Sequence, residues 1–362
     1  MTRLKNWIYS VIQKRNSDPV SRLTRFLLYL VSTVYSLVVR CRNWAYQRNY
    51  FQSFKVDAKV ISVGNLTTGG TGKTPVVIWL AQRIKELSPV AIVSRGYRAE
   101  GTALNDEGKE IAQKLPQVLQ IQNSDRVTAA NVALEKLAAK SELTGPPIVI
   151  LDDGFQHRRL QRDLSIVLLD ATQPFGFGYL LPRGLLREKL SEIRRANIAI
   201  LTRANLVSSQ TRKQIRAEVH SYHPNLQWAE VFLSPKGWQS VHGEFQPLDI
   251  LKDKKLFSFC GIGNPDAFQQ TLMSANLNVL GCQVFEDHQH FSKNDIRQVV
   301  SQANQLSCDA IVCTAKDLVK LKPEDFTETP VFALTTDIEF LSGEEMLVEH
   351  LDELLPKLKN AG

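Results

Sequence analysis

The sequence predicts an α/β protein built on a doubly wound, mostly parallel sheet, with a second, smaller α/β domain and an N-terminal helical segment. Short apolar runs, as expected for strands covered on both faces, alternate with amphipathic segments along most of the chain. This alternation is interrupted by an extended stretch around residues 228–238 and then starts again. The chain before residue 56 has no such alternation and carries one long apolar run.

A chain of 362 residues is long for one core, so we expect two domains. The N-terminal segment covers residues 1–55, the first domain residues 56–227, and the second domain, with its linker strands, residues 228–362. In the first domain the clearest strands are predicted at residues 60–63, 90–94, 148–151, 165–169 and 198–202. In the second domain they are predicted at residues 255–260, near Val279 and at residues 310–314, with a final helix from Gly343.

Residues 59–77 combine a β-branched run, a Gly-rich turn and Gly72-Lys73-Thr74 at the start of an amphipathic segment. This is the strand, loop and helix order of a phosphate-binding P-loop, so the first domain is predicted to be of the P-loop NTPase type. Glycines let successive backbone N–H groups turn toward an anion, and the start of the helix adds its positive end. The predicted nucleotide-binding residues are Thr67, Thr68, Gly69, Gly70, Thr71, Gly72, Lys73, Thr74 and Pro75.

Two side chains of this loop have predicted roles with a nucleoside triphosphate. Lys73 is expected to reach the β- and γ-phosphates, and the Thr74 hydroxyl to bind Mg²⁺. Thr67 stands where the strict pattern has a glycine. A chance Gly-Lys-Thr in a strand-to-helix turn is the alternative, and the correct order of strand, loop and helix argues against it. The implied cofactors are ATP and Mg²⁺.

An acidic pair, Asp152 and Asp153, ends the apolar run at residues 148–151. In P-loop enzymes a carboxylate at the end of a hydrophobic strand holds or orients Mg²⁺, so we predict a metal site made by this pair and Thr74. A turn or helix-cap role is the alternative for a single such residue. Gln156 and His157 follow closely and are candidates for contacting a phosphate or the acceptor.

Four arginines, Arg95, Arg158, Arg183 and Arg187, lie in loops that the strand order sends toward one edge of the sheet. Guanidinium groups bind phosphates in a bidentate manner, and Glu188 is placed to orient Arg187. The alternative is a set of solvated surface arginines. The substrate-binding candidates are Arg95, Gln156, His157, Arg183, Arg187 and Glu188.

The apolar run at residues 26–39 is bounded by arginines on both sides. It is shorter than the roughly 20 residues that cross a hydrocarbon core, and no small-residue cleavage site follows it. We therefore expect an interfacial helix at a membrane surface, with arginines and aromatic residues at headgroup level. A helix packed on the protein's own core remains the alternative.

Composition bounds the function only loosely. A hydrophobic fraction of 43% is typical of a globular protein, and a net charge of +7 favours anionic partners such as nucleotide, phospholipid or nucleic acid. The five cysteines are scattered and include no Cys-x-x-Cys pair, so we expect neither a disulfide framework nor a zinc site, and a reduced, cytosolic chain.

Several blocks together resemble the tetraacyldisaccharide 4′-kinase family, the lipid A 4′-kinases of Gram-negative bacteria. They run in the family's order from about residue 20 to the C-terminus. Apart from the Gly-rich loop with Thr74-Pro75, they are Ser94-Arg95-Gly96-Tyr97, Asn105-Asp106-Glu107, Asp152-Asp153-Gly154-Phe155-Gln156-His157-Arg158, Leu181-Pro182-Arg183-Gly184-Leu185-Leu186-Arg187-Glu188, Gly261-Ile262-Gly263-Asn264-Pro265, Phe285-Glu286-Asp287-His288 and Thr314-Ala315-Lys316-Asp317.

This resemblance implies transfer of the ATP γ-phosphate to the 4′-hydroxyl of a tetraacyldisaccharide 1-phosphate. It implies a glycolipid substrate and a peripheral or monotopic position on the cytoplasmic face of the inner membrane, with no nucleic acid and no protein partner. Lys73 and Thr74 match the phosphate lysine and the metal-binding threonine, and Asp152 and Asp153 the acidic pair around Mg²⁺. Asp106 matches the candidate catalytic base, and His288 the histidine that supports it.

Two other classes were weighed. A membrane-recruited P-loop switch ATPase or GTPase shares the Gly-Gly-x-Gly-Lys-Thr loop, but Thr68 stands where segregation ATPases carry a lysine, and there is no Asn-Lys-x-Asp block. A nucleic-acid-binding module is suggested only by the basic charge and has no recognition motif. Without the resemblance, His288 would be interpreted as a surface-loop histidine beside Asp287.

Overall fold

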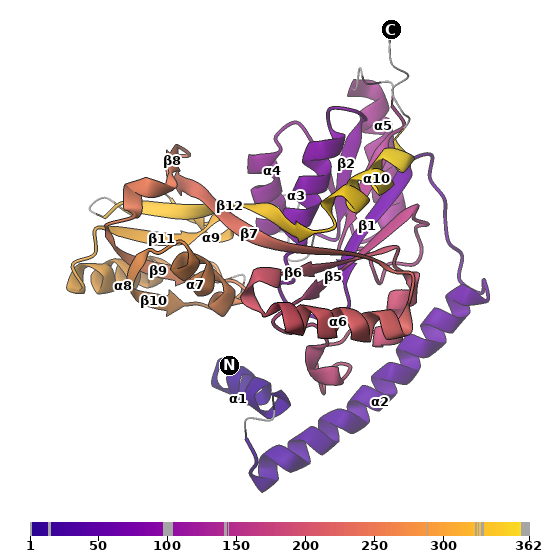
Figure 1. The fold of residues 1–362 in the computed structure, drawn as a ribbon, viewed down its shortest axis with the longest axis horizontal. Helices are drawn as coiled ribbons and strands as arrows, with labels where there is room; N and C mark the ends of the chain where they lie inside the picture. The colour runs from indigo at the N-terminus through magenta and orange to yellow at the C-terminus, as the bar shows by residue number, and fades with distance from the viewer. Residues whose placement is uncertain are drawn as a thin grey trace.

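The computed structural model describes residues 2–13, 16–96, 104–140, 143, 145–287, 289–322, 324, 326 and 329–355. Within these residues a single 12-stranded sheet passes through two lobes (Figure 1). Its order is β10-β9-β11-β12-β7-β6-β5-β1-β4-β2-β3, and β8 pairs with β7 beside this path.

The first lobe holds six parallel strands in the order β6-β5-β1-β4-β2-β3. Nearly all residues of the central strands are buried, as their continuous apolar runs predicted. The edge strand β3 was not predicted, because its half-buried sequence alternates with glutamine and has no apolar run. The strands are β1 (Lys59–Asn65), β2 (Val90–Ser94), β3 (Leu119–Gln122), β4 (Ile148–Asp152), β5 (Leu164–Asp170) and β6 (Ile198–Thr202).

Helices cover both faces of this sheet, which confirms the doubly wound arrangement. One core forms between the sheet and α3 (Lys73–Ile84), α4 (Asp106–Lys114) and α10 (Glu344–Leu354). Further cores form with α5 (Arg126–Lys140), and with α6 (Ser209–Tyr222) and the 3₁₀ segment η2 (Leu190–Arg195). Two shorter 3₁₀ segments are η1 (Gly176–Gly178) and η3 (Ala204–Leu206).

The second lobe is the predicted smaller α/β unit. Its parallel strands are β9 (Lys255–Cys260), β10 (Asn278–Val284) and β11 (Ala310–Thr314). The helix α7 (Pro265–Ser274) contributes to one core of this lobe and α8 (Lys293–Gln305) to another, with α9 (Ala315–Leu318) following β11. The short elements β8 (Phe245–Pro247) and η4 (Leu248–Leu251) precede β9.

Two long antiparallel strands, β7 (Gln227–Ser240) and β12 (Val331–Ser342), join the lobes (Figure 1). The start of β7 pairs with β6 in the first lobe, and the start of β12 pairs with β11 in the second. The extended stretch predicted at residues 228–238 is part of β7, whereas its partner β12 was not predicted. After β12, α10 returns to the first lobe and buries Leu347 and Leu351 in the core around α3.

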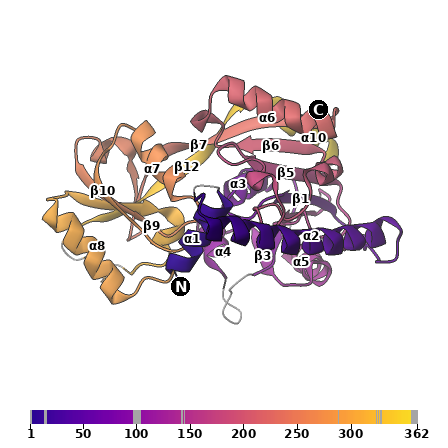
Figure 2. The same cartoon turned by 90° about the horizontal axis from the view of Figure 1, so that it is seen from below.

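The N-terminal segment forms α1 (Thr2–Ile12) and the long helix α2 (Pro19–Gln47), which extends along one side of the first lobe (Figures 1 and 2). The carboxylate of Asp18 caps α2 by accepting from the Ser21 N–H, and Pro19 occupies the first turn. At 29 residues α2 is longer than the predicted apolar run. By length and composition it is able to cross a membrane.

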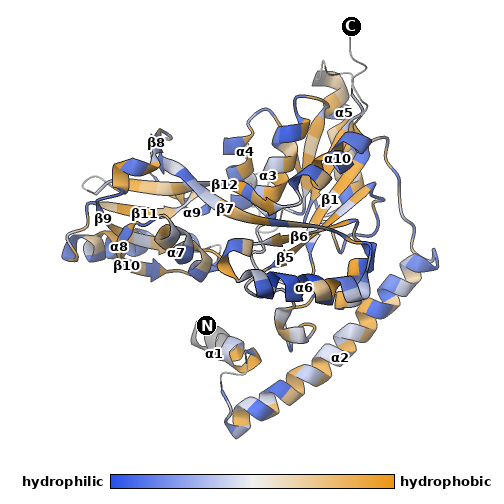
Figure 3. Cartoon of the chain, in the orientation of Figure 1, coloured by the Kyte–Doolittle hydropathy of each residue, from blue (hydrophilic) through white to orange (hydrophobic). Residues whose placement is uncertain are grey.

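Apolar residues (orange) recur along the whole of α2 (Figure 3), but its buried residues are mostly polar, the reverse of a helix in a soluble core. Three of its four buried residues, Ser21, Ser32 and Asn43, are polar. Only 11% of its most apolar 18-residue window is buried, so a helix packed into the protein's own core does not describe α2. Its large exposed apolar or aromatic residues are Val20, Leu23, Phe26, Leu27, Tyr29, Leu30, Val31, Val34, Leu37, Val38 and Trp44.

Candidate active site

A cleft of about 1300 Å³ lies at the carboxyl ends of the parallel strands and is lined by residues of both lobes. Open α/β sheets bind ligands at this edge. The first lobe contributes residues 68–75, the residues after β2 and β4, and part of α2, while the second lobe contributes the loop after β9 and the first turns of α7. Most of the predicted site residues therefore meet in one cavity.

The P-loop is fixed in an anion-binding conformation. Gly72 caps α3 with a left-handed φ of 78°, which favours glycine, and α3 begins at Lys73. From β6, the Thr202 hydroxyl donates to the Thr71 carbonyl at 3.0 Å, and Arg203 donates to the Gly70 carbonyl at 2.7 Å. These two bonds occupy carbonyl oxygens of the loop and no N–H group; of the N–H groups, that of Thr68 donates to the Leu185 carbonyl. Thr67 is buried, forms a bridge with Leu186, and is absent from the cleft lining.

The acidic pair after β4 has two different environments. Asp152 is buried and its Oδ1 has no hydrogen-bond partner; burial raises the pKa of this carboxyl to about 7, and Glu107 adds to the increase. Burial also raises the pKa of Asp153, but Lys73 and Arg187 outweigh it and the net shift is downward. Lys73 Nζ lies 3.5 Å from the Asp153 carboxylate. The pair therefore offers one free buried oxygen beside a salt-bridged carboxylate.

The acidic pair is held beside the P-loop by direct backbone contact. The Gly154 N–H donates to the Val63 carbonyl at 2.9 Å, and Gln156 donates to the Asn65 carbonyl at 2.8 Å. A Cβ on Gly64 would lie 2.5 Å from the backbone nitrogen of Phe155, closer than any side chain permits. Glycine at position 64 therefore allows β1 and the turn after β4 to approach.

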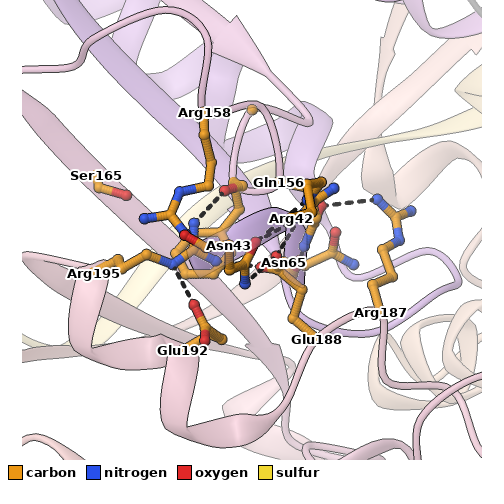
Figure 4. A network of polar contacts seen from close by, with 12 residues as sticks. Arg42, Asn43, Asn65, Gln156, Arg158, Ser165, Arg187, Glu188, Glu192 and Arg195 are labelled. Carbon is orange, nitrogen blue, oxygen red and sulfur yellow. Dashed lines mark hydrogen bonds and ion pairs between the residues drawn. The ribbon is translucent and has the colours of Figure 1, made fainter. Parts of the chain in front are cut away.

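Arg187 and Glu188 belong to two neighbouring networks (Figure 4). Arg187 donates to both Asp153 oxygens at 2.9 and 3.0 Å and lines the cleft. The buried carboxylate of Glu188 instead accepts from Arg42 at 2.6 Å, from Asn43 at 3.2 Å and from Arg195. Glu188 thus anchors α2 to the first lobe, and the expectation that it orients Arg187 is not met.

Only two of the four loop arginines reach the cleft. Arg95 and Arg187 line it. Arg183 is buried, donates to the Ile12 carbonyl at 3.3 Å and lies over the Tyr179 ring at 4.3 Å, so it supports the N-terminal helices. Arg158 lies over the Tyr46 ring and donates to the Asn43 carbonyl. The prediction that all four arginines gather at one edge of the sheet was therefore too coarse, because Arg158 and Arg183 contact the N-terminal helices instead.

The structure adds cleft residues that the sequence did not single out. Arg126, the first residue of α5, is buried and lines the cleft. Burial and the neighbouring Arg95 lower the pKa of its guanidinium. Tyr35, Arg42 and Glu107 also line the cleft. No local pattern distinguishes these residues from ordinary surface residues.

The proposed base, Asp106, is the first residue of α4 and is buried. One of its carboxylate oxygens lies 3.6 Å from Lys320, which also pairs with Asp317 at 3.0 Å. Its neighbours Asn105 and Glu107 line the cleft. His288 and Tyr97 lie outside the described residues.

The oxygen donors of the acidic pair and of Thr74 are of the kind that Mg²⁺ prefers. Among the described residues, no group of three or more histidine, cysteine or acidic side chains gathers to hold a metal. Mg²⁺ is usually bound by one or two carboxylates together with substrate phosphates, so such a cluster is not required. The unpartnered Asp152 oxygen, next to the P-loop that carries Thr74, suits this arrangement.

Comparison with known proteins gives a consistent result. The family model described as Tetraacyldisaccharide-1-P 4′-kinase matches residues 24–356. The chain is 32% identical to the tetraacyldisaccharide 4′-kinase of Halothermothrix orenii over 89% of this chain and 90% of the relative. It is 35% identical to that of Desulfatibacillum aliphaticivorans over 94% and 95%. The crystal structure of LpxK from Aquifex aeolicus in complex with ATP is similar, with a TM-score of 0.70, 30% identity, and coverage of 91% of this chain and 99% of that chain.

His157 lines the cleft, its Nε2 has no hydrogen-bond partner, and burial and Arg126 lower its pKa from 6.5 to about 4. Between pH 6.5 and 4 the unfolded chain therefore binds a proton that the folded chain does not, and stability falls as pH falls through this window. We expect His157→Gln to remove this loss, so that its denaturation midpoint rises relative to wild type between pH 7 and 4. The control is His242→Gln, at an exposed position. If the denaturation midpoints of wild type and His157→Gln changed in parallel with pH, His157 would not be a buried neutral histidine.

Proposed function

The chain belongs to the tetraacyldisaccharide-1-P 4′-kinase family and is a kinase of lipid A biosynthesis, and we propose which of its residues bind the substrates, meet the membrane and transfer the phosphate. The observation that carries the proposal is the P-loop lysine facing an acidic pair in a cleft that also reaches α2. The reaction is transfer of the ATP γ-phosphate to the 4′-hydroxyl of tetraacyldisaccharide 1-phosphate.

The P-loop binds the ATP phosphates. Its N–H groups and the positive end of α3 face the anion, and Lys73 stabilises charge on the transferred group. Lys73 Nζ lies 3.5 Å from both Asp153 and Asn65 Oδ1, so these two residues hold it at the cleft. Asp152 and Thr74 would hold Mg²⁺, with Asp153 beside them. When bound, the metal neutralises phosphate charge and fixes the phosphate orientation.

The acceptor enters from the α2 side. Tyr35 and Arg42 on α2, together with Leu181, line the cleft, while the opposite face of α2 exposes the apolar residues described above. The acyl chains then remain in the bilayer while the disaccharide headgroup reaches the P-loop. An amphipathic helix with arginines at its polar side suits an anionic membrane surface. We place the enzyme on the cytoplasmic face of the inner membrane as a peripheral or monotopic protein.

Asp106, supported by His288, is the proposed base for the 4′-hydroxyl. A sugar hydroxyl is a weak acid, so a carboxylate within hydrogen-bond reach orients it and takes its proton as the bond to phosphorus forms. Asp106 lies between the cleft residues Asn105 and Glu107, and Lys320 balances its charge. This ion pair crosses from α4 in the first lobe to the residues after α9 in the second, so both lobes help to position Asp106.

The P-loop proposal predicts that Lys73→Ala lowers turnover by roughly 100-fold or more, because charge stabilisation on the transferred group is lost. The assay follows radiolabel from [γ-³²P]ATP into tetraacyldisaccharide 1-phosphate in detergent micelles with Mg²⁺. Lys85→Ala, at the far end of α3, is the matched control and should retain activity. Near wild-type labelling by the Lys73 variant would remove the P-loop from the mechanism.

The base proposal predicts that Asp106→Asn lowers kcat with little change in the KM for ATP, and that adding His288→Ala causes little further loss. Glu107→Gln is the matched comparison, because Glu107 is the neighbouring carboxylate that lines the cleft. A larger kcat loss in Glu107→Gln than in Asp106→Asn would transfer the role to Glu107. Additive losses in the Asp106 and His288 double variant would mean that the two act separately.

The membrane proposal predicts that Val34→Glu, at a position 64% exposed on α2, weakens binding to anionic vesicles and raises the KM for lipid more than the KM for ATP. Phe245→Glu, 62% exposed on β8, is the matched control and should bind vesicles as wild type does. Thermal denaturation without lipid should be unchanged in both variants. A lower midpoint for Val34→Glu with unchanged vesicle binding would show that this face packs on protein.

A further inference from the structure

A cluster of charged side chains connects α2 to the turn after β4 (Figure 4). At its centre is Glu188, which is fully buried. On one side its carboxylate accepts from Arg42 at 2.6 Å and from Asn43 at 3.2 Å, both on α2, and on the other side it accepts from Arg195 of η2. A buried carboxylate is costly without its partners, so these bonds fix α2 and η2 relative to each other.

Arg195 extends this cluster to the turn that carries the acidic pair. Its Nη1 donates to the Phe155 carbonyl at 3.2 Å, and its Cζ lies 4.5 Å from the centre of the Phe155 ring. Its Nε lies 3.0 Å from the carboxylate of Glu192. Phe155 is fully buried and follows Asp153 by two positions. One guanidinium therefore joins the carboxylate that holds α2 to the backbone beside the acidic pair.

The turn after β4 depends on support from outside it. Residues 153–158 belong to no helix or strand, and Asp153 has a left-handed φ of 55°, which costs free energy in a residue other than glycine. A second arginine, Arg162, also holds this turn. It donates to the Phe155 carbonyl at 3.3 and 3.4 Å and to the Ser62 hydroxyl at 3.3 Å. The position of the acidic pair is thus determined by side chains that approach the turn from other elements.

A second chain of contacts joins the same two parts of the structure. Tyr35 on α2 donates to the Arg187 carbonyl at 2.9 Å, and the Arg187 side chain donates to both oxygens of Asp153. The two chains of contacts meet the turn at different points, the Asp153 carboxylate and the Phe155 carbonyl. Tyr35 and Arg187 also line the cleft, whereas Glu188 and Arg195, both described by the structure, do not. The contacts through Glu188 therefore separate positioning from direct contact with substrate.

We propose that Glu188 and Arg195 are positioning residues, which couple the docking of α2 to metal-dependent nucleotide binding by the acidic pair. The inference rests on the proposed function, because it takes Asp152 and Asp153 as the carboxylates that hold Mg²⁺. With α2 docked, Glu188 keeps Arg195 on the Phe155 carbonyl and the strained turn keeps its geometry. Loss of the contacts between α2 and Glu188 weakens this support, and groups that orient metal ligands strongly affect metal affinity.

The test measures the affinity of the full-length protein for ATP by isothermal titration calorimetry, in detergent micelles without acceptor lipid, once with Mg²⁺ and once with EDTA. Arg195→Gln should weaken binding of ATP with Mg²⁺ by roughly 10-fold, the lower end of the range for groups that orient metal ligands. Binding of ATP in EDTA should be unchanged, because the P-loop keeps its contacts. Arg194→Gln, at the neighbouring exposed arginine that donates to the Tyr222 carbonyl, is the matched control and should bind as wild type does in both conditions.

Substitutions on α2 test the coupling itself. Asn43→Ala removes a bond from α2 to Glu188 and should weaken binding of ATP with Mg²⁺ by roughly 2-fold or more, with unchanged binding in EDTA. Ser32→Ala is the control on the same helix. It removes a buried bond from α2 to the Leu180 carbonyl and should leave both affinities unchanged. Adding Asn43→Ala to Arg195→Gln should cause little further loss, because both act through Glu188.

Different results would overturn the inference and the proposed function. Equal weakening with Mg²⁺ and with EDTA in Arg195→Gln would overturn the positioning role, because general damage to the fold affects both. Equal effects of Asn43→Ala and Ser32→Ala would overturn the coupling, and so would unchanged affinities in Arg195→Gln. A wild-type affinity that does not depend on Mg²⁺ would overturn the proposed metal site, and the inference with it. If Arg195→Gln does not fold, Asn43→Ala decides: a loss confined to Mg²⁺ supports the coupling, and wild-type binding overturns it.

Discussion

The site depends on the close approach of the P-loop strand β1 to the turn after β4. Because residue 64 is a glycine, the backbone at Phe155 packs directly on β1, and Asp153 then lies within 3.5 Å of Lys73. This contact determines the distance between the phosphate-binding loop and the proposed metal-binding carboxylates. It also positions Asp153 for its salt bridge with Arg187, which connects this part of the site to residues 180–188.

Residues 180–188 connect the P-loop to the N-terminal helix. On one side, the Thr68 N–H donates to the Leu185 carbonyl at 2.8 Å, and the Arg187 N–H donates to the Leu66 carbonyl at 2.7 Å. On the other side, Ser32 donates to the Leu180 carbonyl at 3.0 Å, and Tyr35 donates to the Arg187 carbonyl at 2.9 Å. The polar face of α2 is thus used for docking on the first lobe, which leaves the apolar face exposed. A buried carboxylate, Glu188, completes this docking with partners on both sides.

Local patterns in the sequence predicted the fold and the strand-loop-helix order of the P-loop well, because their physical causes are local. The Gly-rich loop with Lys73, each buried strand and the acidic pair after β4 are each defined by residues that are close together in the sequence. Partners distant in the sequence could not be predicted. Glu188 pairs with Arg42, 146 positions away, and the neighbouring Arg187 pairs with Asp153, 34 positions away. The unpartnered Nε of Arg126 was equally hidden, since it is defined by a contact that is missing rather than by a motif.

The charges in and around the cleft are suited to the proposed phosphorylated ligands. Arg42, Arg187 and Arg195 are neutralised by carboxylates of the chain and so serve to hold its parts together. The Nε of Arg126 has no hydrogen-bond partner, and one oxygen of Asp152 is likewise without a partner. Polar groups of both signs that are buried without hydrogen-bond partners cost stability. A phosphorylated acceptor together with metal-bound nucleotide would satisfy all of them at once, so part of the binding energy is expected to come from relief of this cost rather than from new contacts alone.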